Sequence, residues 1–246
     1  MMADYQPAAD CLRDRVILVT GAGDGIGRAV ALACAAHGAT LVLVGRTEGK
    51  LEKVYDAIEK AGYPQPAIVP LNMESATPRE YQQLAELLTD ELGRLDGLLH
   101  NAAALGIPSP LQHYDVDIWY RVMQVNLHAP FLLTKACLPL LQRAPDPTVV
   151  FTSAEVGRRG RAYWGAYGVA KAGLEGLMQT LAHEMEGTPV RVNSLDPGRC
   201  RTNLRAKAYP GEDPNTVPLP ETVVPSFLYL LGPDSQGIHG QALVSD

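Results

Sequence analysis

The sequence has few cysteines, and none of them is placed to pair with another or to hold a metal. Cys11, Cys34, Cys137 and Cys200 are spread along the chain with no C-x-x-C pair. This spacing argues against a disulfide framework and against a zinc site. None of the six histidines stands at metal-ligand spacing from another ligand, so we predict no metal site. A reducing compartment suits such thiols best, and we expect a cytoplasmic protein.

Long apolar runs and stripes of positive charge are absent as well. No apolar stretch is long enough to span a bilayer, and Asp4, Asp10 and Asp14 stand where a secretion signal would be apolar. The net charge is −6, and the basic residues form no stripe of the kind that binds nucleic acid. We therefore expect neither a membrane nor a nucleic-acid partner. The absence of linkers and internal repeats predicts one domain over residues 1–246.

Glycine is concentrated at one place where it has a clear use. An apolar run over residues 15–20 predicts a strand buried on both faces, and residues 28–37 predict a helix. Glycine in the loop between them lets the backbone approach a pyrophosphate, and the free N–H groups at the start of the helix attract its charge. The strand on one side and the helix on the other predict dinucleotide binding. The expected contacts are Gly21, Gly23, Asp24, Gly25, Ile26 and Gly27.

The end of the next expected strand, residues 40–46, is where such a protein binds the adenosine ribose. An acidic side chain there would bind the 2′-hydroxyl of NAD, but the sequence has Gly45, Arg46 and Thr47. A guanidinium and a hydroxyl suit a 2′-phosphate, so we predict NADP(H) as the cofactor and NAD(H) as the less favoured one. An arginine that merely caps a strand end is the alternative, and Asp24 slightly disfavours further phosphate charge nearby.

Strands and helices alternate along the rest of the chain. Further strands are expected at 67–71, 96–101, 148–154, 189–195 and 241–244, and further helices at 48–61, 77–92, 117–142, 163–184 and 221–231. Such alternation predicts parallel strands joined by right-handed crossovers. We therefore predict an α/β, single-domain Rossmann fold: a doubly wound, mostly parallel seven-stranded sheet with helices on both faces.

Three other segments bear on the site. Asn72 and Asn101 fall at carboxyl ends of strands, where ligands bind, although each could equally be a turn asparagine. Residues 199–218, rich in proline and polar side chains, predict a mobile lid over the reactive end of the cofactor, and residues 1–14 predict an irregular arm.

Pro130 interrupts the expected helix over residues 117–142. Because proline has no N–H, the carbonyl of Asn126 loses its helical partner and is free to bind water or another donor. We expect a kink at Asn126. A packing kink without chemistry is the alternative.

Tyr167 and Lys171 are four residues apart, which places both side chains on one face of a helix. A phenol normally loses its proton near pH ~10, but a neighbouring ammonium favours the phenolate, and such a tyrosine can act as a general acid or base. Taken alone, a pair at this spacing is common on solvated helix faces.

Several motifs together resemble the short-chain dehydrogenase/reductase family over nearly the whole chain. They are TGAGDGIG at 20–27, HNAA at 100–103, VN at 125–126, YGVAK at 167–171 and DPG at 196–198. Within the family, VGRRGRA at 156–162 and WGAY at 164–167 look like the little-characterised bacterial YciK-like branch. The resemblance implies an oxidoreductase that moves a hydride between nicotinamide and a carbonyl or alcohol carbon of a small molecule. It also implies a homodimer or homotetramer built across the helices at 117–142 and 163–184.

The resemblance assigns roles to individual residues. Tyr167 would give the proton to the substrate carbonyl, Lys171 would bind the nicotinamide ribose and lower the pKa of the tyrosine, and the carbonyl of Asn126 would hold a relay water. The other implied cofactor contacts are Asn72, Asn101, Ala102, Ala103, Pro197, Gly198 and Thr202.

One departure from the family concerns the reacting centre. A serine normally stands thirteen residues before the tyrosine, and that position is Ala154. Ser153 is the candidate replacement, but neighbouring side chains of a strand point to opposite faces, so it would need a bulge or a changed register. Thr152 shares the face of Ala154 but lies two residues further along. The alternative function is therefore a weakly active or non-catalytic NADP(H)-binding protein with a regulatory role.

Two groups of side chains near the expected substrate each have two alternative roles. Arg158, Arg159 and Arg161 are either solvated or draw an acidic or phosphorylated substrate to the mouth of the site. Tyr163 and Trp164 could wall the pocket, although the sequence favours core packing for Trp164.

Overall fold

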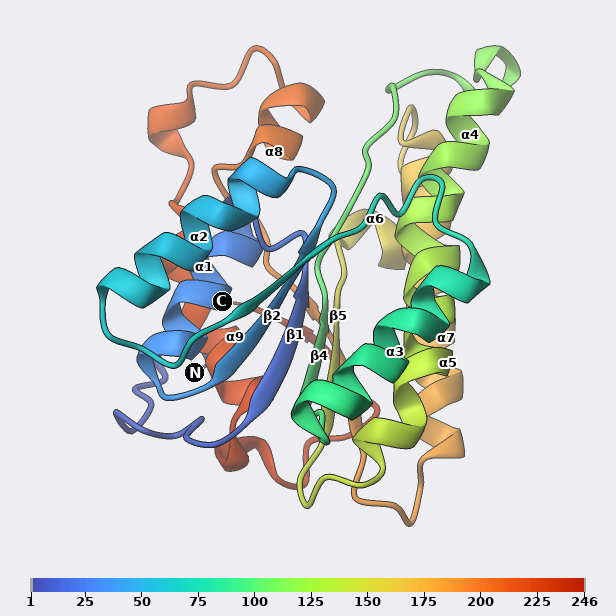
Figure 1. Ribbon diagram of the computed structural model, residues 1–246. Helices are drawn as coiled ribbons and strands as arrows, with labels where there is room; N and C mark the ends of the chain where they lie inside the picture. The colour runs from blue at the N-terminus through green and yellow to red at the C-terminus, as the bar shows by residue number, and fades with distance from the viewer. Residues whose placement is uncertain (1, 246) are drawn as a thin grey trace.

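A seven-stranded sheet runs through the middle of the protein, with helices on both of its faces (Figure 1). The computed structural model describes residues 2–245. The strands lie in the order β3-β2-β1-β4-β5-β6-β7, and all neighbouring pairs in the described chain are parallel. The strands are β1 Val16–Thr20, β2 Thr40–Gly45, β3 Ala67–Pro70, β4 Gly97–His100, β5 Thr148–Thr152, β6 Arg191–Asp196 and β7 Ala242–Val244. The predicted doubly wound Rossmann sheet is confirmed, and it is wholly parallel.

Two apolar cores flank the sheet because its central strands are covered on both sides. Val16 and Leu18 of β1 pack toward α3, α5 and α7, whereas Ile17 and Val19 pack toward α1, α2 and α9. Figure 1 shows these two groups of helices on opposite faces. The α-helices are α1 Gly25–Ala36, α2 Glu48–Lys60, α3 Pro78–Leu92, α4 Val116–Met123, α5 Ala129–Leu141, α6 Glu155–Arg158, α7 Gly165–Glu184, α8 Asn203–Ala208 and α9 Val224–Leu231. None of the helices in residues 2–245 is long and apolar enough to cross a membrane.

The order of the strands reverses between β1 and β4. The chain proceeds from β1 outward to β3 and then returns to place β4 on the other side of β1. The Thr20 hydroxyl ties the two strand ends together, since it accepts hydrogen bonds from the amides of Asn101 (2.9 Å) and Ala102 (3.0 Å). A crevice at the carboxyl ends of the strands is the place where ligands bind in such folds.

The interruption predicted near Asn126 is confirmed, in the form of a π-helical turn. Gln124–His128 forms this turn between α4 and α5, and the amide of Ala129 donates to the carbonyl of Gln124. The Asn126 side chain is fully buried. Its amide nitrogen donates to the carbonyls of Val122 (2.7 Å) and Ala104 (2.8 Å), and its amide oxygen accepts from the amide of Ala104 (3.2 Å). The turn therefore fastens the loop that follows β4.

The segment 199–218 has more regular structure than the sequence predicts. It contains α8 and a short 3₁₀ turn at Pro214–Thr216, which the sequence analysis did not predict. Its position above the sheet end agrees with a lid (Figure 1). The N-terminal arm is irregular as predicted, apart from a 3₁₀ turn at Met2–Asp4.

Candidate active site

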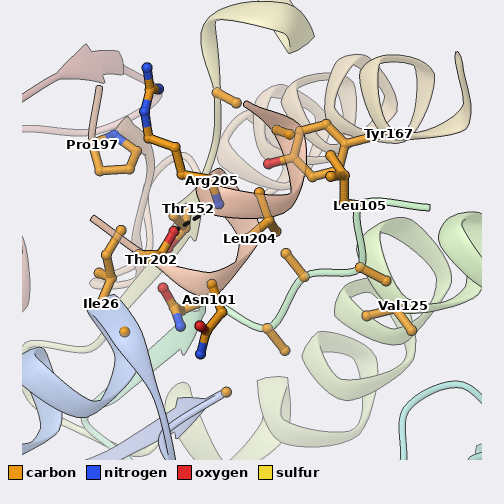
Figure 2. Close-up of a pocket in the computed structure, with 18 of the residues that line it drawn as sticks. Ile26, Asn101, Leu105, Val125, Thr152, Tyr167, Pro197, Thr202, Leu204 and Arg205 are labelled. Carbon is orange, nitrogen blue, oxygen red and sulfur yellow. Dashed lines mark hydrogen bonds between the residues drawn. The ribbon is translucent and has the colours of Figure 1, made fainter. Parts of the chain in front are cut away.

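A cavity of about 950 Å³ opens at the carboxyl ends of the strands. Its volume suits a large ligand. Figure 2 shows Ile26, Pro197 and Thr202 on one side of it and Tyr167 and Leu105 on the other. The predicted site residues that border it are Gly21, Gly23, Asp24, Gly25, Ile26, Arg46, Thr47, Asn72, Asn101, Ala102, Ala103, Ser153, Tyr167, Lys171, Pro197, Gly198 and Thr202. Gly27 and Asn126 lie behind this lining.

The glycine-rich loop brings the start of α1 to the cavity. Gly21 adopts a φ of +67°, in the left-handed region that favours glycine. A Cβ on Gly27 would lie 2.3 Å from the carbonyl oxygen of Gly21, so only glycine allows the helix to pack this closely on the loop. The backbone at this point fits a pyrophosphate, because glycine leaves room for a ligand to approach the start of the helix.

Asp24 links the loop to two other segments. It caps α1 by accepting from the amide of Gly25 (2.8 Å), and its second oxygen binds Lys50 Nζ (2.6 Å) and Asn203 Nδ2 (2.8 Å). The bond from Lys50 is the main reason that the pKa of Asp24 is lowered. Lys50 thereby offsets the negative charge beside the expected pyrophosphate, and Asn203 joins α8 to the glycine-rich loop.

Arg46 and Thr47 lie at the adenosine end of the cavity, where β2 ends and α2 begins. The Arg46 side chain is 68% exposed and forms an ion pair with Glu74 (3.3 Å). Asn72 uses its amide oxygen to accept from the amide of Glu74 (3.2 Å). A 2′-phosphate would therefore have to compete with Glu74 for the guanidinium.

Tyr167 and Lys171 lie side by side in the cavity wall, 6% and 2% exposed. Lys171 Nζ is 5.7 Å from the centre of the Tyr167 ring and donates to the carbonyl of Thr152 (2.6 Å). Burial lowers the pKa of Lys171 to about 8, against an opposing effect of Asp196. Burial also raises the pKa of Tyr167, and Asp196 adds to this. The expected lowering of the tyrosine pKa by the lysine is not met in this geometry, because burial and Asp196 both disfavour the charged phenolate.

Comparison with known proteins agrees with this geometry. The family model for short chain dehydrogenases matches residues 15–213. The chain belongs to the short-chain dehydrogenase/reductase family. The uncharacterised oxidoreductase YciK of Escherichia coli K12 is 47% identical over 232 residues, which are 94% of this chain and 92% of YciK. The predicted likeness to this branch is confirmed.

Two solved structures of the family superpose closely on the protein. A short chain dehydrogenase from Pseudomonas syringae is 55% identical and has a TM-score of 0.97, with 99% of each chain covered. A short chain dehydrogenase from Escherichia coli CFT073, complexed with NADPH, is 45% identical and has a TM-score of 0.95, with 98% of this chain and all of that chain covered.

Ala154 occupies the position of the usual family serine. It borders the cavity, packs against the same cluster of side chains as Tyr167, and precedes α6 as its N-cap. A methyl group cannot donate a hydrogen bond. Ala154 therefore cannot supply the hydroxyl donor that the family resemblance implies at this position.

Ser153 does not replace the missing hydroxyl in this geometry. It borders the cavity, but its hydroxyl donates to Glu175, a buried carboxylate that also accepts from Ser194 (2.7 Å) and Arg158 (3.0 Å). A serine hydroxyl can donate only one hydrogen bond, and Ser153 donates it to Glu175. The structure thus gives no support to Ser153 as a catalytic donor; the reason is its bond to Glu175 and not strand alternation, since β5 ends at Thr152.

Thr152 carries the hydroxyl that this strand leaves available. It is 7% exposed, it borders the cavity, and its Oγ1 has no hydrogen-bond partner in residues 2–245. A buried hydroxyl without a partner is costly, and a ligand in the cavity could satisfy it. The carbonyl of Thr152 also accepts a hydrogen bond from Lys171 Nζ (2.6 Å).

The sequence analysis weighed some residues near the cavity wrongly and missed others. Trp164 borders the cavity, although the sequence favoured core packing for it, and Tyr163 points to solvent with 61% exposure. Tyr209 and Arg205 border the cavity from the lid segment. Motifs could not reveal them, because the lid has no fixed sequence pattern. The contact of Asn203 with Asp24 joins residues 179 positions apart and leaves no local signal.

Proposed function

We propose that the protein is an NADP(H)-dependent oxidoreductase that transfers a hydride between nicotinamide and a carbonyl or alcohol carbon of a small molecule. One observation carries the proposal: Tyr167 and Lys171 lie side by side in the wall of the cavity into which the glycine-rich loop opens. The short-chain dehydrogenase crystallised with NADPH supports the choice of cofactor. The cytoplasmic location stays a prediction.

The residues around the cavity fit the successive parts of NADP(H). The start of α1 suits the pyrophosphate, Arg46 and Thr47 suit the 2′-phosphate, and Asn72 has an amide oxygen near the expected adenine. The remaining contacts, toward the nicotinamide half, are Asn101, Ala102, Ala103, Thr152, Pro197, Gly198 and Thr202. When bound, the cofactor supplies or accepts the hydride.

The protein's own side chains handle the proton. Tyr167 is buried and its pKa is raised, so its phenol is protonated at neutral pH and can donate to the oxygen of a carbonyl substrate. Lys171 has three N–H donors and uses one on Thr152, which leaves two for the nicotinamide ribose. We assign the carbonyl of Asn126 to a water that returns the proton from solvent, and this part of the proposal rests on family resemblance.

The preference for NADPH gives a direct test at Arg46. Charge-assisted contacts contribute on the order of 1.5 to 3 kcal/mol, so Arg46→Ala should weaken NADPH binding roughly tenfold to a hundredfold and leave NADH binding nearly unchanged. Competition from Glu74 places the expected loss toward the lower end. Calorimetry with both cofactors measures it, and Arg143→Ala removes an equal charge outside the cavity as a control. Equal losses for the two cofactors would refute the role of Arg46.

A second candidate function rests on Ala154. Without the usual donor, the protein could bind NADP(H) and reduce carbonyl compounds slowly or not at all, acting instead as a regulator that responds to nucleotide. One experiment distinguishes the two candidate functions. The unmodified protein is mixed with NADPH and with activated aldehydes or diketones, and the consumption of NADPH is measured. Turnover that depends on Tyr167 supports the oxidoreductase, and tight NADPH binding without turnover supports the regulator.

We also propose a homodimer or homotetramer across α4, α5 and α7. Large apolar side chains on these helices are exposed in the single chain: Val116, Tyr120, Phe131 and Val169. Burial of such a surface against a second copy would remove it from water. Light scattering should give at least twice the 26.5 kDa mass of one chain, and Tyr120→Asp should reduce that mass. A 26.5 kDa particle at micromolar concentration would rule out this assembly.

A further inference from the structure

Beyond the catalytic tyrosine, the cavity continues along a row of aromatic rings. The Trp164 ring lies 5.6 Å from the ring of Tyr167 and 5.9 Å from that of Tyr209. The guanidinium of Arg205 in turn lies over the Tyr209 ring, 4.5 Å from its centre. Other apolar side chains line the same part of the cavity, namely Leu105, Val156, Leu204 and Ala208. A path of flat, apolar faces therefore leads from the Tyr167 phenol to the Arg205 guanidinium, which is itself paired with Glu212.

Basic residues from α6 and the loop after it, and from the lid segment 199–218, border the same cavity, although the whole protein has a net charge of −6. They are Arg158, Arg159, Arg161, Arg199, Arg205 and Lys207. Carboxylates pair with four of them: Glu175 with one, Glu155 with one and Glu212 with two. Three carboxylates thus balance only half of six cations.

Arg159 and Lys207 are the two cations of this group without a carboxylate partner in the described part of the chain. Arg159 follows α6, and Lys207 lies in α8, so the scaffold and the lid each contribute one. Cations gathered at a concave mouth create a positive potential that concentrates anions there. Because neither residue has a carboxylate partner, both positive charges remain able to attract an anionic ligand.

We propose that the substrate is a carbonyl compound that carries an anionic group, a carboxylate or a phosphate, separated from the carbonyl by an apolar and preferably flat body. The carbonyl meets Tyr167, the body lies against Trp164 and Tyr209, and the anion meets Arg159 and Lys207. The inference rests on the proposed reductase function and names the class of substrate for that site.

The test compares two aldehydes that differ only in charge, 4-(4-formylphenyl)benzoate and its methyl ester, with saturating NADPH. We expect kcat/KM for the acid to exceed that for the ester by about tenfold, mainly through KM. The double variant Arg159→Ala, Lys207→Ala should lower kcat/KM for the acid by about tenfold and leave the ester unchanged. The control variant Lys135→Ala, Arg143→Ala removes two positive charges outside the cavity and should preserve the preference. Comparison of 4-formylbenzoate with 4-formylphenyl phosphate shows which anion is preferred.

Each outcome decides something different. Equal kcat/KM for acid and ester, or an equal loss for both in the Arg159, Lys207 variant, overturns the inference and leaves the reductase function standing. Failure to reduce either aldehyde counts against the proposed function. In that case, calorimetry of biphenyl-4-carboxylate and its methyl ester with the NADP⁺-loaded protein still tests the anion site. Tighter binding of the carboxylate that the double variant abolishes supports the site, and equal binding overturns it.

Discussion

Tyr167→Phe should reduce carbonyl turnover by roughly a hundredfold to ten-thousandfold, because the change removes the group that donates the proton. The substitution deletes one oxygen and keeps the ring, which packs 5.6 Å from the Trp164 ring in a buried cluster. The fold and the NADPH affinity should therefore change little. Steady-state consumption of NADPH and calorimetric titration with NADPH measure the two quantities. A variant that keeps more than about a tenth of the turnover would show that another group supplies the proton.

The pH dependence of the same reaction should reflect the loss of the proton from the Lys171 ammonium. Burial lowers the pKa of this lysine to about 8, so its ammonium is present below that pH and is lost as the pH rises through it. Turnover should therefore fall above about pH 8 if the ammonium is needed. The raised pKa of Tyr167 keeps the phenol protonated over this range, so the tyrosine should not cause that fall.

The parts of the site predicted from the sequence are those whose signal is local. The glycine-rich loop lies between an apolar strand and a helix start, and the Tyr167 and Lys171 pair follows from a spacing of four residues in α7. Glu175, the partner of Ser153, lies four residues after Lys171 and could have been noticed by the same periodicity.

Other features depend on distant contacts, which one sequence does not show. The six residues of α8 are too few to be stable as an isolated helix, and bonds from Asn203 to Asp24 and from Arg205 to Glu212 hold this segment. The direction of the Tyr167 pKa was also misjudged from the sequence. Spacing shows that a lysine is near, but the depth of burial that raises the pKa of the phenol comes from the packing of several elements.

Ala154→Ser should increase the turnover of activated carbonyl compounds by a large factor. Loss of one preorganised donor to a developing oxyanion costs about 2.7 to 4 kcal/mol where it has been measured, or roughly a hundredfold to a thousandfold in rate. Restoring the donor should recover a substantial part of that factor. NADPH affinity should barely change, because the added hydroxyl lies at the substrate side of Tyr167.

The backbone around Ala154 favours this result. The residue is the N-cap of α6, with φ −161° and ψ 152°, and such a position accepts serine readily. An N-cap hydroxyl uses its oxygen to accept from amides of the first helical turn, so its proton stays free for the substrate. Ser153 does not supply this function already, since it donates to Glu175, and the Thr152 hydroxyl belongs to the last residue of β5, two residues before Ala154.

Tyr167→Phe in the Ala154→Ser background gives the decisive comparison. A serine that only assists proton transfer should confer no gain once the phenol is gone, so the double variant should be as slow as Tyr167→Phe alone. If Ala154→Ser is neutral while the unmodified protein already turns over briskly, then Thr152 or the substrate itself supplies the donor. Thr152→Val distinguishes these, because it removes that hydroxyl with little change in shape. If no variant reduces any carbonyl although all bind NADPH, the nucleotide-responsive regulator becomes the better account of the protein.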